Sequence, residues 1–245
     1  METITIFYPM YNEETYLERV VEAGREVGDL MVAEGEISDY EILLIDDAST
    51  DSTGKMADEL SAKDRRVKVV HHQANRGLGA SMKSGFTHAG MDVILYSDAD
   101  LPFEMTTLRK AYRLMRYYEA DIVSAFRFDR TGEGLRRLIY SAVYNVLIKT
   151  FFCLWIKDVN SPFKLVRRDI FKNITLKSEG SFIDAELLIK ARQYGFKTIQ
   201  FGADYFPRSH GVSRASGWGV IVKILKEMFR LRREIKAIVP TVTKR

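Results

Sequence analysis

Two aspartates, Asp98 and Asp100, lie one residue apart directly after the apolar segment VILYS. Carboxylates at this spacing repel each other and destabilise the fold unless a cation lies between them. Hard cations such as Mg²⁺ bind carboxylate oxygens and keep waters or substrate phosphates as their remaining ligands. A pair of solvated aspartates in a turn is the alternative interpretation, but the position at the end of a strand-like segment favours a site for a hard cation such as Mg²⁺.

A second acidic group follows the apolar residues LLI in the stretch LLIDDASTDST. Its first aspartate, Asp46, is placed to accept hydrogen bonds from a nucleobase or a ribose. Asp51 or Ser52 is placed to cap the helix that should follow, which explains these two residues fully. The glycines of NRGLGAS also precede an expected helix and could let the backbone approach a ligand, although a tight turn is the commoner explanation.

Short apolar segments alternate with helical patterns in the first half of the chain. The expected strands are TITIFYP, YEILLID, RVKVVHH, MDVILYSD and ADIVSAF, and the expected helices are 13 to 33, 53 to 63, 78 to 89 and 104 to 118. This alternation predicts an α/β fold with a Rossmann-like, mainly parallel central sheet flanked by helices, and the second half adds amphipathic helices. Ligands of such sheets bind at the carboxyl ends of the strands. The polar residues expected there are Tyr11, Asp46, Asp47, Asn75, Asp98 and Asp100.

The 245 residues carry a net charge of +4 and contain no flexible linker or low-complexity segment. We therefore expect a single domain with subdivisions 1–130 and 131–215 and a basic amphipathic C-terminal helix, 216–245. The single cysteine, Cys153, excludes an internal disulfide framework or a multi-cysteine zinc site and favours a reducing compartment. Because the chain begins with a strand-like segment rather than a basic leader, we expect a cytoplasmic location.

Four motifs occur in order along the chain: YPMYNEE, LLIDDASTDST, NRGLGAS and YSDADLP. Together they resemble the motifs of family-2 glycosyltransferases, which have the GT-A fold. The resemblance implies that the first half binds a UDP- or GDP-sugar, whose nucleoside would be held by Pro9, Tyr11, Glu13 and Asp46. It also implies that Asp98 and Asp100 bind the diphosphate through Mg²⁺ or Mn²⁺, which would neutralise the leaving group as the sugar departs.

The stretch RLIYSAVYN has the spacing R-x-x-x-S-x-x-x-N, which puts Arg137, Ser141 and Asn145 on one face of a helix. A polar stripe on an amphipathic helix is the alternative interpretation. The pattern resembles the acceptor-phosphate site of polyprenyl-phosphate (dolichol-phosphate mannose synthase-like) sugar transferases. The resemblance implies that 131–215 is the acceptor half and that Arg127 also binds phosphate, to which the planar guanidinium is well matched.

Two later stretches extend the resemblance. In FPRSHGVSR, Arg208, Ser213 and Arg214 resemble the loop that closes over the donor diphosphate, although a basic surface loop is the alternative. SFIDAE matches the pattern F-x-x-D-x-E, which implies that Asp184 and Glu186 lie near the acceptor. A capping or salt-bridging role for these two acids is nearly as well supported by the residues themselves.

The D-x-D motif departs from the related synthases at Pro102. They often carry Gln at this position as a further metal-site group, and proline offers no side-chain ligand. Metal affinity or geometry could therefore differ.

Segment 138 to 156 is long enough to cross a bilayer, but Asn145 and Lys149 interrupt it. We expect an interfacial helix whose aromatic residues face lipid headgroups, namely Tyr140, Tyr144, Phe151, Phe152 and Trp155. The basic C-terminal helix could pack on the core, pair with a second subunit in a homo-oligomer, or lie on anionic lipid. No nucleic-acid motif accompanies the charge, so nucleic acid is not an expected partner.

The predicted protein is an inverting, metal-dependent transferase that moves a hexose from a UDP- or GDP-sugar to a polyprenyl phosphate, dolichyl or undecaprenyl, on the cytoplasmic face of a membrane. One alternative is a related glycosyltransferase that acts on a sugar hydroxyl, with Asp184 as the base. The other is a non-catalytic subunit that binds a nucleotide sugar or a membrane. Pro102 makes this last alternative more credible, whereas the retained D-x-D argues against it.

Overall fold

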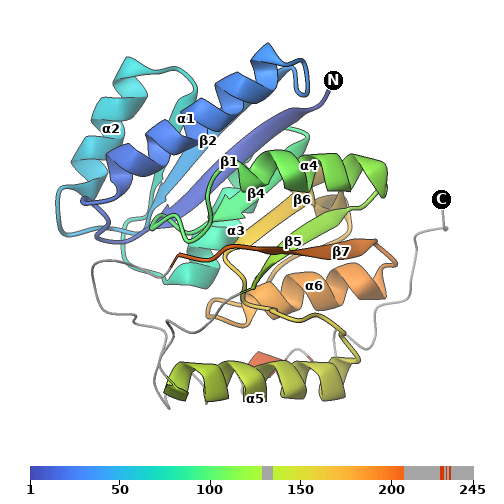
Figure 1. Cartoon of the computed structure of the whole chain (residues 1–245). Helices are drawn as coiled ribbons and strands as arrows, with labels where there is room; N and C mark the ends of the chain where they lie inside the picture. Colours follow the sequence, from blue (N-terminus) through green and yellow to red (C-terminus); the bar gives the residue numbers. More distant parts are fainter. Residues whose placement is uncertain (129–134, 207–226, 229, 231, 233–245) are drawn as a thin grey trace.

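The computed structural model describes residues 1–128 and 135–206, together with 227, 228, 230 and 232, and for 135–140 it describes the backbone alone. Seven strands form one sheet in the order β3-β2-β1-β4-β6-β5-β7 (Figure 1). The strands are β1 Thr3–Met10, β2 Asp39–Asp46, β3 Val67–His71, β4 Val93–Ser97, β5 Ile122–Arg127, β6 Phe163–Arg167 and β7 Thr198–Ala203. The helices are α1 Leu17–Ala33, α2 Thr53–Lys63, α3 Leu78–His88, α4 Thr107–Tyr117, α5 Leu135–Phe152, α6 Ile183–Gln193 and a 3₁₀ turn, Arg168–Lys172.

Neighbouring strands run parallel except at β6, which is antiparallel to both β4 and β5. The predicted mainly parallel sheet flanked by helices is therefore confirmed. Strands from both halves of the chain belong to this one sheet. Its inner strands are continuous apolar segments, as expected where helices cover both faces.

Helices cover the sheet on two faces (Figure 1). On one face α1, α2 and α4 bury residues such as Tyr8, Leu17 and Leu108 in one apolar cluster. On the other face α3 and α6 bury residues such as Phe7 and Leu188 in a second cluster. Gly85 of α3 lies directly on the Phe7 ring, because a methyl group added there would come within 2.3 Å of it. The two layers hold the strand ends in fixed register.

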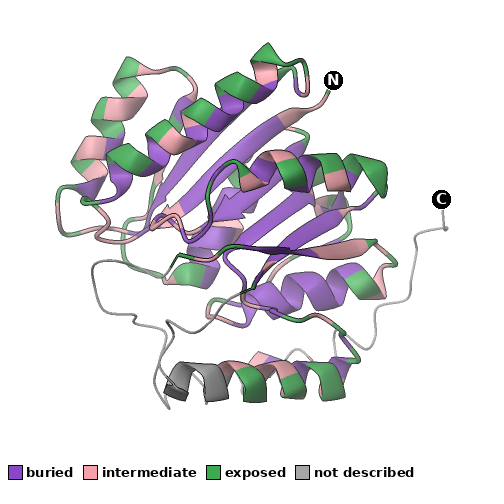
Figure 2. Cartoon of the chain, viewed as in Figure 1, coloured by how far each residue is buried: buried purple, intermediate pink, exposed green. Residues whose placement is uncertain are grey.

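Helix α6 is buried on all sides, since each residue from Ile183 to Ala191 is buried (Figure 2). It lies between the sheet and a further layer that contains α5 (Figure 1). The end of α5 is fastened to α6, because Arg192 donates a hydrogen bond to the carbonyl of Phe152 at 2.7 Å. Met228 belongs to the second apolar cluster, which contains Phe7 and Leu188, and it is 1% exposed. Met228 therefore packs on the core, whereas the basic C-terminal helix expected over 216–245 lies outside the described residues except at 227, 228, 230 and 232.

The outer side of α5 exposes apolar residues. Val143 and Val146 are 51% and 60% exposed, and Trp155, just beyond the helix, is 77% exposed. The aromatic residues predicted to face headgroups behave differently, because Phe152 is buried and Phe151 and Tyr144 are partly buried against the core. That expectation is wrong for these three residues, since α5 must cover α6. Among the described residues, no helix combines the length and the apolar character that a membrane crossing needs.

The carboxyl ends of all strands except β6 lie at one edge of the sheet, which we call the carboxyl edge. Three residues just beyond these ends have left-handed backbone, namely Asn12 after β1, Ala48 after β2 and Leu101 after β4, with φ of 57°, 57° and 50°. Such conformations cost energy for residues other than glycine and are common at functional sites. The carboxyl edge is thus also the place where the backbone is strained.

Replacing Ala48 by Gly should stabilise the protein, because glycine adopts a positive φ without the clash of a Cβ atom. We expect Ala48→Gly to raise the free energy of unfolding by about 1 kcal/mol, which is a shift of roughly 2–4 °C in Tm for a chain of this size. Ala23→Gly, in the middle of α1, is the matched control and should lower it by about 1 kcal/mol. Thermal and urea unfolding measure both, and equal losses in the two variants would contradict strain at Ala48.

Candidate active site

Asp98 and Asp100 follow β4 at the carboxyl edge, as the sequence predicted. The buried Tyr96 hydroxyl donates a hydrogen bond of 2.7 Å to Oδ1 of Asp98. Burial, and then the nearby charge of Asp100, raise the pKa of Asp98 to about 7. The charge of Asp100 therefore disfavours ionisation of Asp98, which is the repulsion that the sequence argument expected.

The donor set at the D-x-D turn fits a hard divalent cation. Bringing a cation to Asp98 and Asp100 would remove the repulsion that raises the pKa of Asp98. Among the described residues, no group of three or more His, Cys, Asp or Glu side chains is arranged to hold a metal. A pair of carboxylates with open positions for water and substrate phosphates is the arrangement that Mg²⁺ accepts in phosphate-handling sites.

A buried ion pair lies beside the D-x-D turn. Lys164 in β6 is fully buried, and its Nζ lies 2.6 Å from Oδ1 of Asp184 and 2.5 Å from the carbonyl of Ser161. In the sheet, Lys164 stands opposite Tyr96, the residue that binds Asp98. Burial raises the pKa of Asp184, while the ammonium of Lys164 opposes that rise. Asp184 therefore lies near the D-x-D turn, but its carboxylate is held by Lys164.

Arg127 ends β5 at the same edge and is buried. Its guanidinium makes two bonds to Asp158, with Nε to Oδ2 at 2.8 Å and a terminal nitrogen to Oδ1 at 3.0 Å. Asn145 of α5 binds the same short loop, donating to the carbonyl of Lys157 at 3.3 Å and accepting from the amide of Val159 at 3.4 Å. The structure thus brings together two elements of the predicted phosphate site, Arg127 and the face of α5 that carries Ser141 and Asn145.

The predicted nucleoside residues lie at and after the ends of β1 and β2. Pro9 is within β1, and Tyr11 and Glu13 follow it in partly exposed positions. Asp46 is buried at the end of β2, where Oδ1 accepts from the Ser49 amide at 3.0 Å and Oδ2 lies 2.9 Å from Nδ1 of His71. Burial opposes ionisation, but hydrogen bonds from Ser49 and His71 hold the pKa of Asp46 below its usual value.

Two residues that organise this edge were missed as site residues by the sequence argument. Asn12 joins the loop after β1 to the loop after β2, because its Oδ1 accepts from the Thr50 amide at 2.8 Å and its backbone N–H donates to Oγ of Ser49 at 3.0 Å. Asp47 accepts from the amides of Arg76 and Gly77 at 2.9 and 2.7 Å and so fixes the glycine loop. The doubled acid D-D was the available signal for Asp47, whereas nothing in the sequence singled out Asn12.

Other expectations receive a structural explanation. Asp51 does support the start of α2, since Oδ1 accepts from the Thr53 amide at 2.9 Å, whereas Ser52 makes no side-chain cap. Gly79 allows a close approach, but to protein rather than to a ligand, because a methyl group there would lie 2.4 Å from the backbone of Glu179. Glu186 is fully buried and accepts from Lys190 and from the amide of Ser178, which is the salt-bridging alternative.

Arg208, Ser213 and Arg214 and the side chain of Arg137 lie outside the described residues. The start of the late basic stretch can nevertheless be located, because the Phe206 amide donates to the carbonyl of Pro102 at 2.9 Å. Pro102 therefore joins the D-x-D turn to the beginning of FPRSHGVSR through its backbone.

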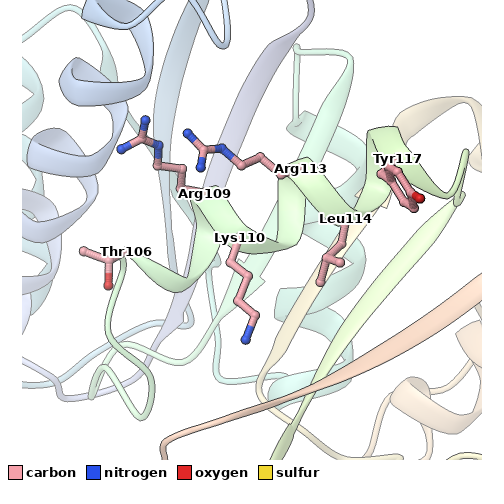
Figure 3. A pocket seen from close by; sticks show the side chains of 6 residues that line it. All are labelled: Thr106, Arg109, Lys110, Arg113, Leu114 and Tyr117. Atoms are coloured by element: carbon pink, nitrogen blue, oxygen red, sulfur yellow. The ribbon is translucent and has the colours of Figure 1, made fainter.

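A pocket of about 560 Å³ lies elsewhere, along α4 (Figure 3). Its lining residues are Thr106, Arg109, Lys110, Arg113, Leu114 and Tyr117. Arg109 and Arg113 both pair with Glu36, at 2.6 and 2.5 Å, and Arg109 also pairs with Glu34. No residue predicted for the site lines this pocket.

The sheet order and the acidic turn at its carboxyl edge define a GT-A glycosyltransferase fold. The chain belongs to glycosyl transferase family 2, whose family model matches residues 5–175. Solved structures with this fold include glucosyl-3-phosphoglycerate synthase from Mycobacterium tuberculosis (TM-score 0.67, 16% identity, 92% of this chain and 79% of that one). Another is the mannosyltransferase PcManGT from Pyrobaculum calidifontis in complex with GDP-Man and Mn²⁺ (TM-score 0.63, 17% identity, 96% and 68%).

Three curated relatives are similar in sequence. The glycosyltransferase AglD from Haloferax volcanii is 28% identical over 84% of this chain, which spans a third (33%) of AglD. The polyprenol monophosphomannose synthase from Mycolicibacterium smegmatis is 30% identical over 86% of this chain and 80% of that protein. The dolichol-phosphate mannosyltransferase from Pyrococcus furiosus is 27% identical over 94% of this chain and 64% of that protein.

The raised pKa of Asp98 predicts how stability depends on pH in chelator-treated protein. The pKa of Asp98 is about 7 in the folded protein and 3.8 in the unfolded chain. Protonated Asp98 therefore stabilises the fold fully below pH 3.8, and this contribution is lost as the pH rises through 7. The free energy of unfolding should therefore carry a component that falls between about pH 4 and pH 7. Urea unfolding across this range measures it.

Asp98→Asn should remove that component, because the amide does not ionise. Mn²⁺ should restore stability to the wild type most strongly near pH 7, where the repulsion is greatest. If the free energy of unfolding of Asp98→Asn depended on pH just as that of the wild type does, Asp98 would not be the group that titrates.

Proposed function

We propose that this glycosyltransferase moves a hexose from a UDP- or GDP-sugar to a polyprenyl phosphate, with inversion at the anomeric carbon. The observation that carries the proposal is that one sheet edge brings together Asp46, the D-x-D pair and Arg127. These are the groups expected for a nucleoside, a diphosphate and an acceptor phosphate, respectively.

The donor is supported from two sides. Asp46 is held ionised at the end of β2, and the pKa of Asp98 rises because Asp100 lies beside it. The fold neighbour PcManGT is in complex with GDP-Man and Mn²⁺, and glucosyl-3-phosphoglycerate synthase is in complex with Mn²⁺ and UDP-glucose in another structure. These titles support a nucleotide sugar and a divalent cation, Mg²⁺ or Mn²⁺, without distinguishing between the two nucleotides.

The acceptor is supported by the relatives and by the second half. Two of the three relatives are named for polyprenol or dolichol phosphate. Arg127 and Asn145 bind the same loop around Asp158, so a guanidinium, a carboxylate and an amide form a polar wall at the carboxyl edge. Ser141 and Arg137 lie one and two turns before Asn145 on α5 and would complete that wall.

The chain's own residues would act mainly by position and charge. Arg127, Arg137 and Ser141 orient the acceptor phosphate, which is already ionised at neutral pH and needs no strong base. Its oxygen forms a bond to the anomeric carbon as the bond from that carbon to the diphosphate breaks. Arg208, Ser213 and Arg214 are expected to hold the departing nucleoside diphosphate. Mg²⁺ or Mn²⁺, held by Asp98 and Asp100, would supply positive charge to that diphosphate.

The rival acceptor, a sugar hydroxyl, would require Asp184 to take a proton. Asp184 is instead bound to the fully buried Lys164 at 2.6 Å. Removing its charge would leave a buried ammonium without its counter-charge, which costs about 3–5 kcal/mol. Loss of activity in Asp184→Asn could therefore come from loss of structure, so identification of the product is the sharper test.

Transfer from labelled UDP- and GDP-hexoses to polyprenyl phosphate should give a lipid-linked product that EDTA abolishes and Mn²⁺ restores. Asp98→Asn and Asp100→Asn should each lower kcat/KM by roughly 100-fold or more, because charge stabilisation of the leaving group is lost. Asp169→Asn is the control, since Asp169 is exposed and follows β6 at the edge of the sheet opposite to the carboxyl edge. Product formed only on a glycan hydroxyl would establish the rival acceptor. Nucleotide binding without transfer to any acceptor would favour a non-catalytic subunit.

A lipid acceptor predicts that the protein binds a membrane surface through the exposed side of α5. The triple variant Val143→Ser, Val146→Ser and Trp155→Ser should weaken binding to vesicles that contain anionic lipid by about tenfold or more, because exposed apolar area is lost. Leu30→Ser with Tyr117→Ser removes exposed apolar residues on the other side of the sheet and serves as the control. Equal vesicle binding by all three proteins would exclude this surface.

A further inference from the structure

Two histidines at the end of β3 face the two aspartates at the end of β2. Asp46 pairs with His71 in the register of the parallel strands, and Asp47 and His72 come next in each chain segment. His71 Nδ1 lies 2.9 Å from Oδ2 of Asp46, and His72 Nδ1 lies 2.6 Å from Oδ1 of Asp47. Each acid of the D-D pair therefore has a histidine of its own.

The two histidines differ in the partner of Nε2, the second ring nitrogen. His72 Nε2 lies 2.7 Å from the hydroxyl of Ser84, which can donate or accept. His71 Nε2 lies 3.0 Å from Oδ1 of Asp58 on α2, so both of its ring nitrogens face carboxylates. An ionised carboxylate only accepts hydrogen bonds, so both nitrogens of His71 must carry protons. Hydrogen bonds to Asp46 and then to Asp58 accordingly raise the pKa of His71 above its usual value.

The Asp46 carboxylate is held by Ser49, through its side chain and its backbone amide, and by His71. The Ser49 amide holds Oδ1 and His71 holds Oδ2. Gly54 packs against the same Oδ2, because a methyl group at that position would come within 2.9 Å of it. Asp46 is buried, whereas the side chain of His71 is 42% exposed, so His71 stands between the buried acid and solvent.

We propose that His71 is a positioning residue for the nucleoside of the donor: through Nδ1 it fixes the Asp46 carboxylate in the orientation that a nucleoside diphosphate requires. This inference depends on the proposed function, in which Asp46 receives the nucleoside. Because His71 acts through Asp46, removing its bond to Asp46 weakens donor binding and leaves the transfer step unchanged. The outer bond to Asp58 holds the ring in place from α2 and is not needed for donor binding.

Two substitutions of His71 each keep one of its two hydrogen bonds and remove the other. His71→Asn keeps an amide nitrogen near the position of Nδ1, so it can still donate to Asp46 but does not reach Asp58. His71→Gln places its amide nitrogen near the position of Nε2, so it can reach Asp58 but not Asp46. Each variant loses one hydrogen bond to a carboxylate, so a purely structural role predicts similar effects of both on stability and on binding.

The test is the Kd for UDP and for GDP with Mn²⁺ by calorimetry, together with the KM for the donor, kcat and urea unfolding. For the nucleotide that the wild type binds, we expect His71→Gln to raise Kd and KM by about tenfold, the effect of losing one charge-assisted hydrogen bond, with kcat within about twofold. His71→Asn should stay within about twofold of the wild type. Asp58→Asn should behave like His71→Asn, because it also leaves the bond to Asp46 in place.

The outcomes distinguish the two proposals. If the wild type binds nucleotide and His71→Gln binds it equally well, or if both His71 variants lose the same affinity, the positioning role is wrong and the proposed function stands. If the wild type binds neither nucleotide at any Mn²⁺ concentration, the proposed function fails and this inference fails with it.

Discussion

The structure depends on how a single sheet edge holds a group of acidic side chains out of bulk water. A buried carboxylate is costly unless a cation or several hydrogen bonds compensate for lost hydration. At the carboxyl edge three acids have a base as a partner: His71 for Asp46, Lys164 for Asp184 and Arg127 for Asp158. Asp46 also accepts hydrogen bonds from Ser49. Asp98 differs, because its hydrogen-bond donor is the neutral Tyr96 hydroxyl and Asp100 raises its pKa further. The edge is therefore arranged so that the greatest benefit from an added cation falls at the D-x-D turn.

The sequence predicted the sheet and the edge well because both depend on local pattern. Apolar segments of strand length alternate with helical periods, and parallel strands must place their carboxyl ends together. That reasoning located Asp46 and the D-x-D pair without any knowledge of contacts. It could not find Asn12, because that residue acts by joining two loops that are 37 or 38 positions apart. Nor could it tell that Lys164 would hold Asp184, since that pair joins β6 to α6 between residues 20 positions apart.

The second half of the chain was harder to predict because burial there depends on which helix layer covers which. An apolar segment with aromatic residues is compatible with a lipid surface and with a second layer over a buried helix. Because α6 is buried on all sides, α5 must cover it, and this requirement turns Phe152 inward while Trp155 remains outside. Periodicity identifies the apolar side of a helix but not what lies against it.

Two attachments fix the position of α5 relative to the carboxyl edge, one at Asn145 and one at the end of the helix. Asn145 binds the loop around Asp158, which Arg127 holds at the end of β5, and Arg192 of α6 binds the end of α5. A surface that docks on the exposed side of α5 would therefore lie in a fixed orientation relative to Arg127 and the D-x-D turn. For an acceptor whose phosphate is attached to a lipid, this rigidity would let the membrane itself contribute to positioning, because the lipid brings the phosphate to a wall whose distance from the surface is set by the fold.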